Sequence, residues 1–210
     1  MKRNSLAFLL AASALAMTAS GPANAGKNDD VARIVLNGEV GSLNFYFDNS
    51  RESLVTALQI YNGLVYRDPV SGEFKGDLAT KWSWPDDKTI EFQLRNDVKF
   101  SNGEAFDADD VVFTINYIAD PANKIIWSDQ IGWLKSAEKV DDYTVRLHLK
   151  EPYAMAMAAL SGFVPIYPKD YYEKVGLSGM AANPVGTGPY QVTSVTPGSG
   201  YTLKRNPNYF

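Results

Sequence analysis

The spacing of apolar residues predicts an amphipathic helix over residues 51–61. The apolar side chains there recur at intervals of three and four and share one helix face: Leu54, Val55, Leu58 and Tyr61. Ser50 precedes the run as a helix cap, and Asn62-Gly63 follows it as a stop signal. We therefore expect a helix that buries this face.

A second helix is predicted to begin at Asp107, which can cap it, with Asp110 three residues later in the position of a capping box. The apolar residues that follow continue one face: Val111, Val112, Ile115 and Ile118. The helix is expected to end at Asp120-Pro121, because the residue before a proline disfavours the helical conformation.

Alternation of apolar and polar residues predicts strands along much of the remaining chain. Single strands are expected at residues 32–36, 89–94, 191–195 and 201–204. Residues 139–149 predict a hairpin with Asp141-Asp142 at its turn, which places His148 on the face opposite Leu147. Short extended pieces flank a turn at residues 68–72.

Beyond the hairpin the pattern changes. Small and flexible apolar residues from 153 to 160 predict a short buried helix, and the prolines and glycines from Pro165 to Gly179 predict an irregular connection. Subdomain boundaries are expected near Asn62 and Val164, because the stretch between them is rich in strands and hairpins.

The first 25 residues have the order of an export signal. Two basic residues, an apolar run from Leu6 to Met17 and the small-residue sequence Ala23-Asn24-Ala25 follow one another, so cleavage is expected after Ala25. An uncleaved membrane anchor is the alternative, but a spanning helix needs roughly 20 apolar residues, more than this run provides. We expect a periplasmic protein with no membrane insertion after cleavage.

Composition narrows the possible functions. With 45% hydrophobic and 21% charged residues the chain can form a core, and 20 basic against 24 acidic residues give no electrostatic basis for binding nucleic acid. The chain has no cysteine and one histidine, which excludes thiol nucleophiles, zinc clusters of Cys and His, and any Ser-His-Asp triad that does not use His148. We expect no metal site and no other cofactor.

Acidic doublets at 86–87, 109–110 and 141–142 leave a secreted carboxylate-dependent hydrolase as the alternative function. Local roles in turns and at a helix start account for them better, because neighbouring residues point apart. Gly186-Thr187-Gly188 precedes a predicted strand rather than a helix, so a phosphate-binding loop is not expected.

Trp127 is the aromatic residue that best suits a ligand cleft. Trp82, Trp84 and Trp133 are expected in the core, whereas Trp127 lies in a loop-like stretch after Pro121. Polar groups for the same cleft could come from one short run, Asp48, Asn49, Ser50 and Arg51. Ligand binding by these five residues is a hypothesis at this point.

Six stretches of the sequence resemble the extracellular solute-binding proteins of family 5, the dipeptide, oligopeptide and nickel type that serves ABC importers. They are Tyr61-Asn-Gly-Leu-Val-Tyr66, Gly76-Asp-Leu-Ala-Thr-Lys-Trp82, residues 90–103 (IEFQLRNDVKFSNG), Phe106-Asp-Ala-Asp-Asp-Val-Val-Phe113, Asn183-Pro-Val-Gly-Thr-Gly-Pro-Tyr190 and Arg205-Asn-Pro-Asn-Tyr209. The resemblance covers nearly the whole chain beyond residue 25.

This resemblance implies an α/β fold of the periplasmic-binding-protein type (class II), a two-lobed receptor that closes around its ligand. Residues 26–62 would begin the first lobe, 63–164 would form its β-rich extra subdomain, and 165–210 would return into it. The expected partners are a ligand and the permease subunits of an ABC importer, with the receptor a monomer. Short peptides are the favoured ligands, and opines, oligosaccharides and a nickel complex are the alternatives.

Family members are much longer than 210 residues. The resemblance therefore implies that the sequence is the amino-terminal portion of a two-lobed receptor, either as a fragment or as the product of a truncated gene. A chain without that lobe is expected to bind its ligand weakly or not at all, and to aggregate, because one wall of the cleft is left uncovered.

Overall fold

The structure is a computed structural model that describes residues 38, 41–196 and 200–210. Residues 34–210 form one compact unit. The predicted signal peptide, its cleavage site and the predicted strand at 32–36 lie outside the described residues. In the described part of the chain, no helix is both long and apolar enough to cross a membrane.

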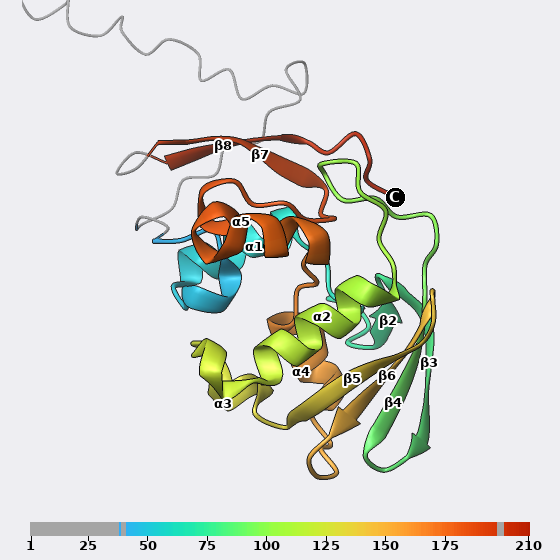
Figure 1. The fold of residues 1–210 in the computed structure, drawn as a ribbon. Coiled ribbons are helices and arrows are strands. Elements are labelled where there is room, and N and C mark those ends of the chain that lie inside the picture. Colours follow the sequence, from blue (N-terminus) through green and yellow to red (C-terminus); the bar gives the residue numbers. More distant parts are fainter. Residues whose placement is uncertain (1–37, 39–40, 197–199) are drawn as a thin grey trace, which may run out of the picture. The chain divides into compact units, whose positions relative to one another are not determined.

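A four-stranded antiparallel sheet dominates the middle of the chain (Figure 1). Its order is β3 (Ala79–Asp86), β4 (Thr89–Leu94), β6 (Thr144–Leu149), β5 (Leu134–Asp141). Helix α2 (Ala108–Ala119) packs across one face of the sheet. The buried residues Val145, Leu147 and Leu149 of β6 lie on this face. The predicted hairpin is confirmed, and His148 lies on the opposite, half-exposed face of β6.

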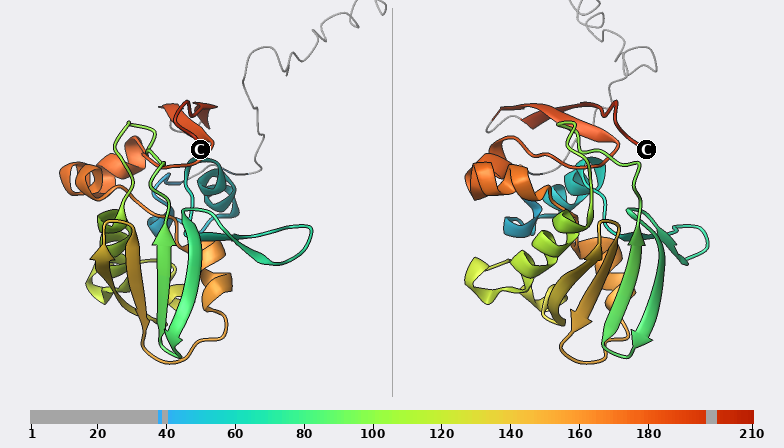
Figure 2. Two further views of the ribbon diagram at one scale, coloured as in Figure 1. Left: turned by 90° about the vertical axis from the view of Figure 1, so that its right-hand side faces the viewer. Right: turned by 45° about the vertical axis from the view of Figure 1, so that its right-hand side comes forward.

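Most of the remaining elements lie on the α2 side of this sheet or beyond one end of its strands (Figure 2). Two hairpins flank it in the chain, β1 (Val65–Arg67) with β2 (Phe74–Gly76), and β7 (Tyr190–Thr196) with β8 (Gly200–Arg205). The helices are η1 (Phe45–Phe47), α1 (Arg51–Ile60), η2 (Pro121–Asn123), α3 (Ser128–Ile131), α4 (Ala156–Phe163) and α5 (Lys169–Ala182).

Both predicted helix starts are confirmed. The Ser50 side chain accepts a hydrogen bond from the backbone N–H of Ser53, and α1 begins directly after it. At α2, Asp107 accepts from the N–H of Asp109, and Asp110 accepts from the N–H of Asp107. The capping box therefore satisfies backbone donors that a helix start would otherwise leave unpaired.

The predicted buried face of α1 is wrong. Its buried residues within the helix are Ser53, Thr56, Ala57 and Ile60, whereas Leu58 is 59% exposed. The inward face therefore carries three small side chains and one large one, and at its end the Gly188 N–H donates to the carbonyl of Ile60. Leu54 and Leu58 instead border a surface hollow.

The predicted irregular connection from Pro165 to Gly179 is also wrong, because α5 occupies most of it. Pro168 lies just before the helix, where no intrahelical hydrogen bond requires a backbone N–H. Gly176 has a φ of 64°, so it interrupts the helix without ending it. A third discrepancy is Trp84, which is 42% exposed on the edge strand β3, where a core position was expected.

The sequence Gly186-Thr187-Gly188 joins three separate parts of the fold. A Cβ at Gly186 would overlap the carbonyl oxygen of Ile60, and the N–H of Gly188 donates to that same oxygen at 3.0 Å. The Gly186 carbonyl accepts from the N–H of Ser101 at 2.9 Å. These glycines permit a backbone contact that any side chain would prevent.

We predict that Gly186→Ala lowers the free energy of unfolding by about 3 kcal/mol, the upper part of the usual cost of overpacking. Gly162→Ala is the control, because a Cβ there meets nothing within 4 Å and Gly162 lies inside α4. The control should raise stability by about 0.5–1 kcal/mol. Urea unfolding measures both values, and equal effects would contradict the prediction.

We also predict a pH dependence from Asp110. Burial raises the pKa of its carboxyl to about 7 from an ordinary 3.8. Between these values the folded state binds a proton that the unfolded state does not, so stability should increase as the pH falls from 8 to 5. In Asp110→Asn this increase should be smaller.

Urea unfolding at several pH values across that range measures the effect. Asp109→Asn is the matched control, because Asp109 is exposed in the same helical turn and pairs with Lys139 at 2.9 Å. Identical pH slopes for the wild-type chain and Asp110→Asn would refute the assignment.

Candidate ligand-binding site

Asp48 closes the loop that leads into α1. One carboxylate oxygen accepts from the N–H of Ser42 and the other from the N–H of Ser50, each at 2.8 Å. Charged acceptors make stronger hydrogen bonds than neutral ones, so this side chain holds both ends of residues 42–50. We call residues 42–50 the Asp48 loop. Since each oxygen already has a backbone donor, Asp48 organises the loop rather than presenting a free carboxylate.

The other three predicted polar residues differ in their surroundings. Ser50 is engaged as the cap of α1. Asn49 is exposed. The Arg51 side chain is 71% exposed, and its contact with Glu52, at 3.5 Å, is long. Of the four, Asn49 and Arg51 therefore have side chains that remain accessible to a ligand.

Trp127 lies against the segment that leads into Asp48. Its indole N–H donates to the carbonyl of Phe45 at 2.9 Å, and its ring stacks on that of Phe45 with centroids 5.3 Å apart and planes 13° apart. The ring of Phe163 also packs against Trp127, with ring centroids 5.2 Å apart. The structure thus brings Trp127 and the beginning of the Asp48 loop together, although 82 positions separate Trp127 and Phe45.

Trp127 does not lie in an open loop. It occupies the position before the short helix α3, and the N–H of Ile126 donates to the carbonyl of Tyr46 at 3.1 Å. The indole is half-buried. Because its N–H is engaged by Phe45, Trp127 would offer a ligand an apolar surface rather than a hydrogen-bond donor.

Buried tyrosines lie beneath the Asp48 loop, and sequence reasoning did not assign them to the site. The rings of Tyr46 and Tyr61 pack against Tyr167 with centroids 4.9 and 5.0 Å away. Burial raises the pKa of all three hydroxyls, so each stays protonated and can donate. Their clustering comes from segments far apart in the chain, which leaves no local pattern to detect.

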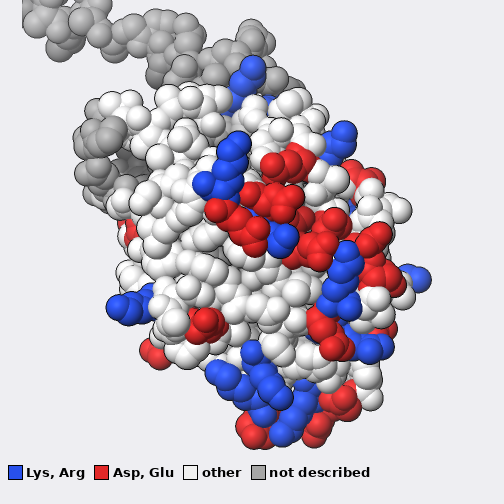
Figure 3. Space-filling model, in the orientation of Figure 1, with Lys and Arg blue, Asp and Glu red and all other residues white. Residues whose placement is uncertain are grey.

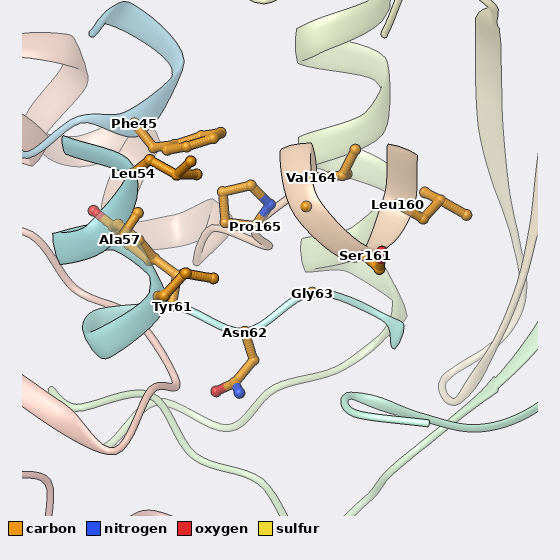
Figure 4. A pocket seen from close by; sticks show the side chains of 12 residues that line it. Phe45, Leu54, Ala57, Tyr61, Asn62, Gly63, Leu160, Ser161, Val164 and Pro165 are labelled. Carbon is orange, nitrogen blue, oxygen red and sulfur yellow. The ribbon is translucent and has the colours of Figure 1, made fainter. Parts of the chain in front are cut away.

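A small apolar hollow opens between α1 and α4 (Figure 4). The residues that line it include Phe45, Leu54, Leu160 and Pro165. Its volume is about 40 Å³. Pockets for small molecules measure about 300–1,000 Å³, so this hollow by itself cannot enclose a peptide.

Both predicted subdomain boundaries lie at this hollow. Asn62 and Val164 line it, and the N–H of Ile166 donates to the carbonyl of Asn62 at 3.0 Å. The two connections between the β-rich stretch and the rest of the unit therefore run side by side. The boundaries themselves stay a prediction.

The acidic doublets have local contacts. Asp86 accepts from the N–H of Lys88, and Asp141 accepts from the N–H of Tyr143, both within turns. Figure 3 shows acidic side chains gathered around basic ones on one face, and Lys139 lies 2.9 Å from both Asp109 and Asp142. Within the described ranges, no group of three acidic, histidine or cysteine side chains is arranged to hold a metal ion.

A sequence profile described as the middle part of the bacterial extracellular solute-binding proteins, family 5, matches residues 73–210. The chain belongs to this family. The match includes the sheet, Trp127 and the Gly186-Thr187-Gly188 contact, and the fold is that of periplasmic binding proteins of the family 5 type. The predicted resemblance is thus confirmed.

Individual family 5 proteins show the same relationship. The periplasmic oligopeptide-binding protein OppA of Haemophilus influenzae is 29% identical over 175 residues, which cover 73% of this chain and 32% of that protein. The structure of MoaA from A. tumefaciens R10 with mannopinic acid has 34% identity and a TM-score of 0.75, covering 80% of this chain and 35% of MoaA.

A dipeptide-binding protein from Pseudoalteromonas sp. SM9913, solved with Met-Leu, has 27% identity and a TM-score of 0.73. That match covers 81% of this chain and 38% of the other. The chain therefore spans about a third of the length of the relatives that it matches, and the described part corresponds to a portion of one lobe.

We predict that Asp48→Ala lowers the free energy of unfolding by about 2 kcal/mol, because two backbone donors lose a charged acceptor. Asn49→Ala, a change at the exposed neighbouring position, should alter it by less than about 0.5 kcal/mol. Chemical denaturation of both variants measures the difference. A loss at Asp48 no larger than that at Asn49 would show that the loop does not depend on this carboxylate.

Proposed function

We propose that this chain is part of the periplasmic substrate-binding component of an ABC importer, that short peptides are its ligands, and that it passes them to permease subunits. Membership of solute-binding family 5 supports transport rather than catalysis. The named relatives include an oligopeptide-binding and a dipeptide-binding protein, which supports a peptide ligand. Export by a signal peptide cleaved after Ala25 and a monomeric receptor belong to the same proposal.

The observation that carries the proposed site is the contact between Trp127 and Phe45, a residue of the Asp48 loop. It combines an apolar wall with an ordered stretch of polar backbone, and Arg51 adds an exposed cation. Ligand sites usually combine such apolar walls with a few placed polar groups. A peptide could lay an apolar side chain on the indole and direct a carboxylate toward Arg51.

We propose that residues 26–62 and 165–210 contribute to the first lobe and that 63–164 form its extra subdomain. The adjacent passage of the chain at Asn62 and Ile166 supports this division. The second lobe would supply the other wall of the cleft.

The test is isothermal titration calorimetry of the whole receptor that contains this chain, with the dipeptide Met-Leu as probe. Trp127→Ala and Arg51→Ala should each raise the Kd about tenfold, the effect of losing roughly 1.4 kcal/mol of contact energy. Trp84→Ala is the control, because Trp84 is exposed on β3 and no ligand role is assigned to it. Unchanged affinity in both site variants would refute the assigned site.

The same titration separates the alternative ligands and functions. Tight binding of mannopinic acid without binding of Met-Leu would assign the chain to opines, the ligand class of the MoaA structure. Release of cleaved product from a peptide or sugar would favour a secreted hydrolase and contradict the proposal.

A further inference from the structure

Tyrosine hydroxyls hold the beginning of the Asp48 loop from the protein interior. The N–H of Phe45 donates to the Tyr167 hydroxyl at 2.9 Å, and that hydroxyl donates to Oδ1 of Asn44 at 3.1 Å. The Tyr61 hydroxyl donates to the carbonyl of Leu43 at 3.0 Å. All of these groups are buried, so water does not compete for the bonds.

Tyr167 is itself rigidly placed. Its side chain is 2% exposed, and its backbone N–H donates to the hydroxyl of Thr114 on α2 at 3.0 Å. Rings of neighbouring tyrosines enclose its own ring, including Tyr172 at 5.8 Å. The Tyr167 hydroxyl therefore offers the loop a fixed point that belongs to the core.

Phe45 transmits this constraint to the surface. Its N–H is bonded to Tyr167, while its carbonyl accepts the indole N–H of Trp127 and its ring stacks on the indole. A displacement of Phe45 would therefore turn the indole. A binding surface gains affinity when its side chains are held in place before the ligand arrives.

We infer that Tyr167 is a positioning residue for ligand binding, because its hydroxyl fixes Phe45 and through it the orientation of the Trp127 indole. The consequence for ligand binding rests on the proposed function. The positioning itself can be measured without any ligand.

The test compares Tyr167→Phe with Tyr172→Phe in the whole receptor that contains this chain. Tyr172 is buried in the same cluster and lies beside the Asn44 side chain, but its hydroxyl donates to that of Tyr117. Among the described residues it makes no hydrogen bond to the backbone of 43–45. Both variants lose one buried hydroxyl, and only Tyr167→Phe loses the backbone anchor.

The readouts are ¹⁹F NMR of 5-fluorotryptophan and amide hydrogen exchange. The Trp127 resonance, identified by its loss in Trp127→Phe, should shift in Tyr167→Phe and stay in place in Tyr172→Phe. Exchange of the Phe45 amide should accelerate about tenfold in Tyr167→Phe only, as expected when one buried hydrogen bond is lost. An unchanged Trp127 resonance, or an equal change in both variants, would overturn the inference.

A measurement on the unmodified receptor covers the case in which Tyr167→Phe does not fold. The Phe45 amide should exchange at least about tenfold more slowly than the Ser50 amide, whose acceptor Asp48 is only half-buried. Equal exchange rates would show that Tyr167 does not anchor Phe45.

Titration with Met-Leu separates this inference from the proposed function. Tyr167→Phe should raise the Kd about tenfold and Tyr172→Phe should leave it unchanged. If the Trp127 resonance responds to Tyr167→Phe but Trp127→Ala leaves the Kd for Met-Leu unchanged, the ligand-binding role of Trp127 fails while the anchoring of Phe45 stands. If the unmodified receptor does not bind Met-Leu at all, the peptide-binding proposal fails and the anchoring of Phe45 again stands.

Discussion

The close contact between Gly186-Thr187-Gly188 and the end of α1 is the constraint on which the described unit depends. Because the two backbones meet at the Ile60 carbonyl, α1 is fixed against the segment that begins β7. Thr187 extends the contact by donating to Asn62, whose amide in turn donates to the half-buried carboxylate of Asp77. Asn206, after β8, donates to the Gly188 carbonyl from the other side. Hydrogen bonds therefore join four regions of the chain at this point.

This contact explains both the success and the failure of sequence reasoning on α1. The start of the helix was predictable, because a serine cap acts on its own local backbone and needs no tertiary partner. The buried face was not predictable, because the segments that pack against α1, such as Gly186–Gly188 at Ile60 and Tyr201 at Thr56, come from the far end of the chain. Helical spacing shows which residues share a face, but not how closely another segment approaches that face.

A similar division holds elsewhere. The β5–β6 hairpin and the capping box of α2 depend on neighbouring residues, and both were predicted. Helix α5 was missed because Pro168 and Gly176 are local breaker signals, although a proline before a helix and a single glycine within it leave the helix possible. At the site, Asp48 to Arg51 and Trp127 were named from the sequence. The tyrosines beneath them were not, because Tyr61 and Tyr167 meet only after folding.

The paired passage at Asn62 and Ile166 has a mechanical consequence. Two chain crossings bonded to each other define a single line about which the β-rich stretch could swing. A second tie lies elsewhere, where Ser101 bonds to Gly186 and the Asn208 side chain donates to the Phe100 carbonyl. Because the β-rich stretch is bonded at this second point as well, it cannot rotate about the line through Asn62 and Ile166. The β-rich stretch and the rest of the described unit are therefore expected to move as one piece.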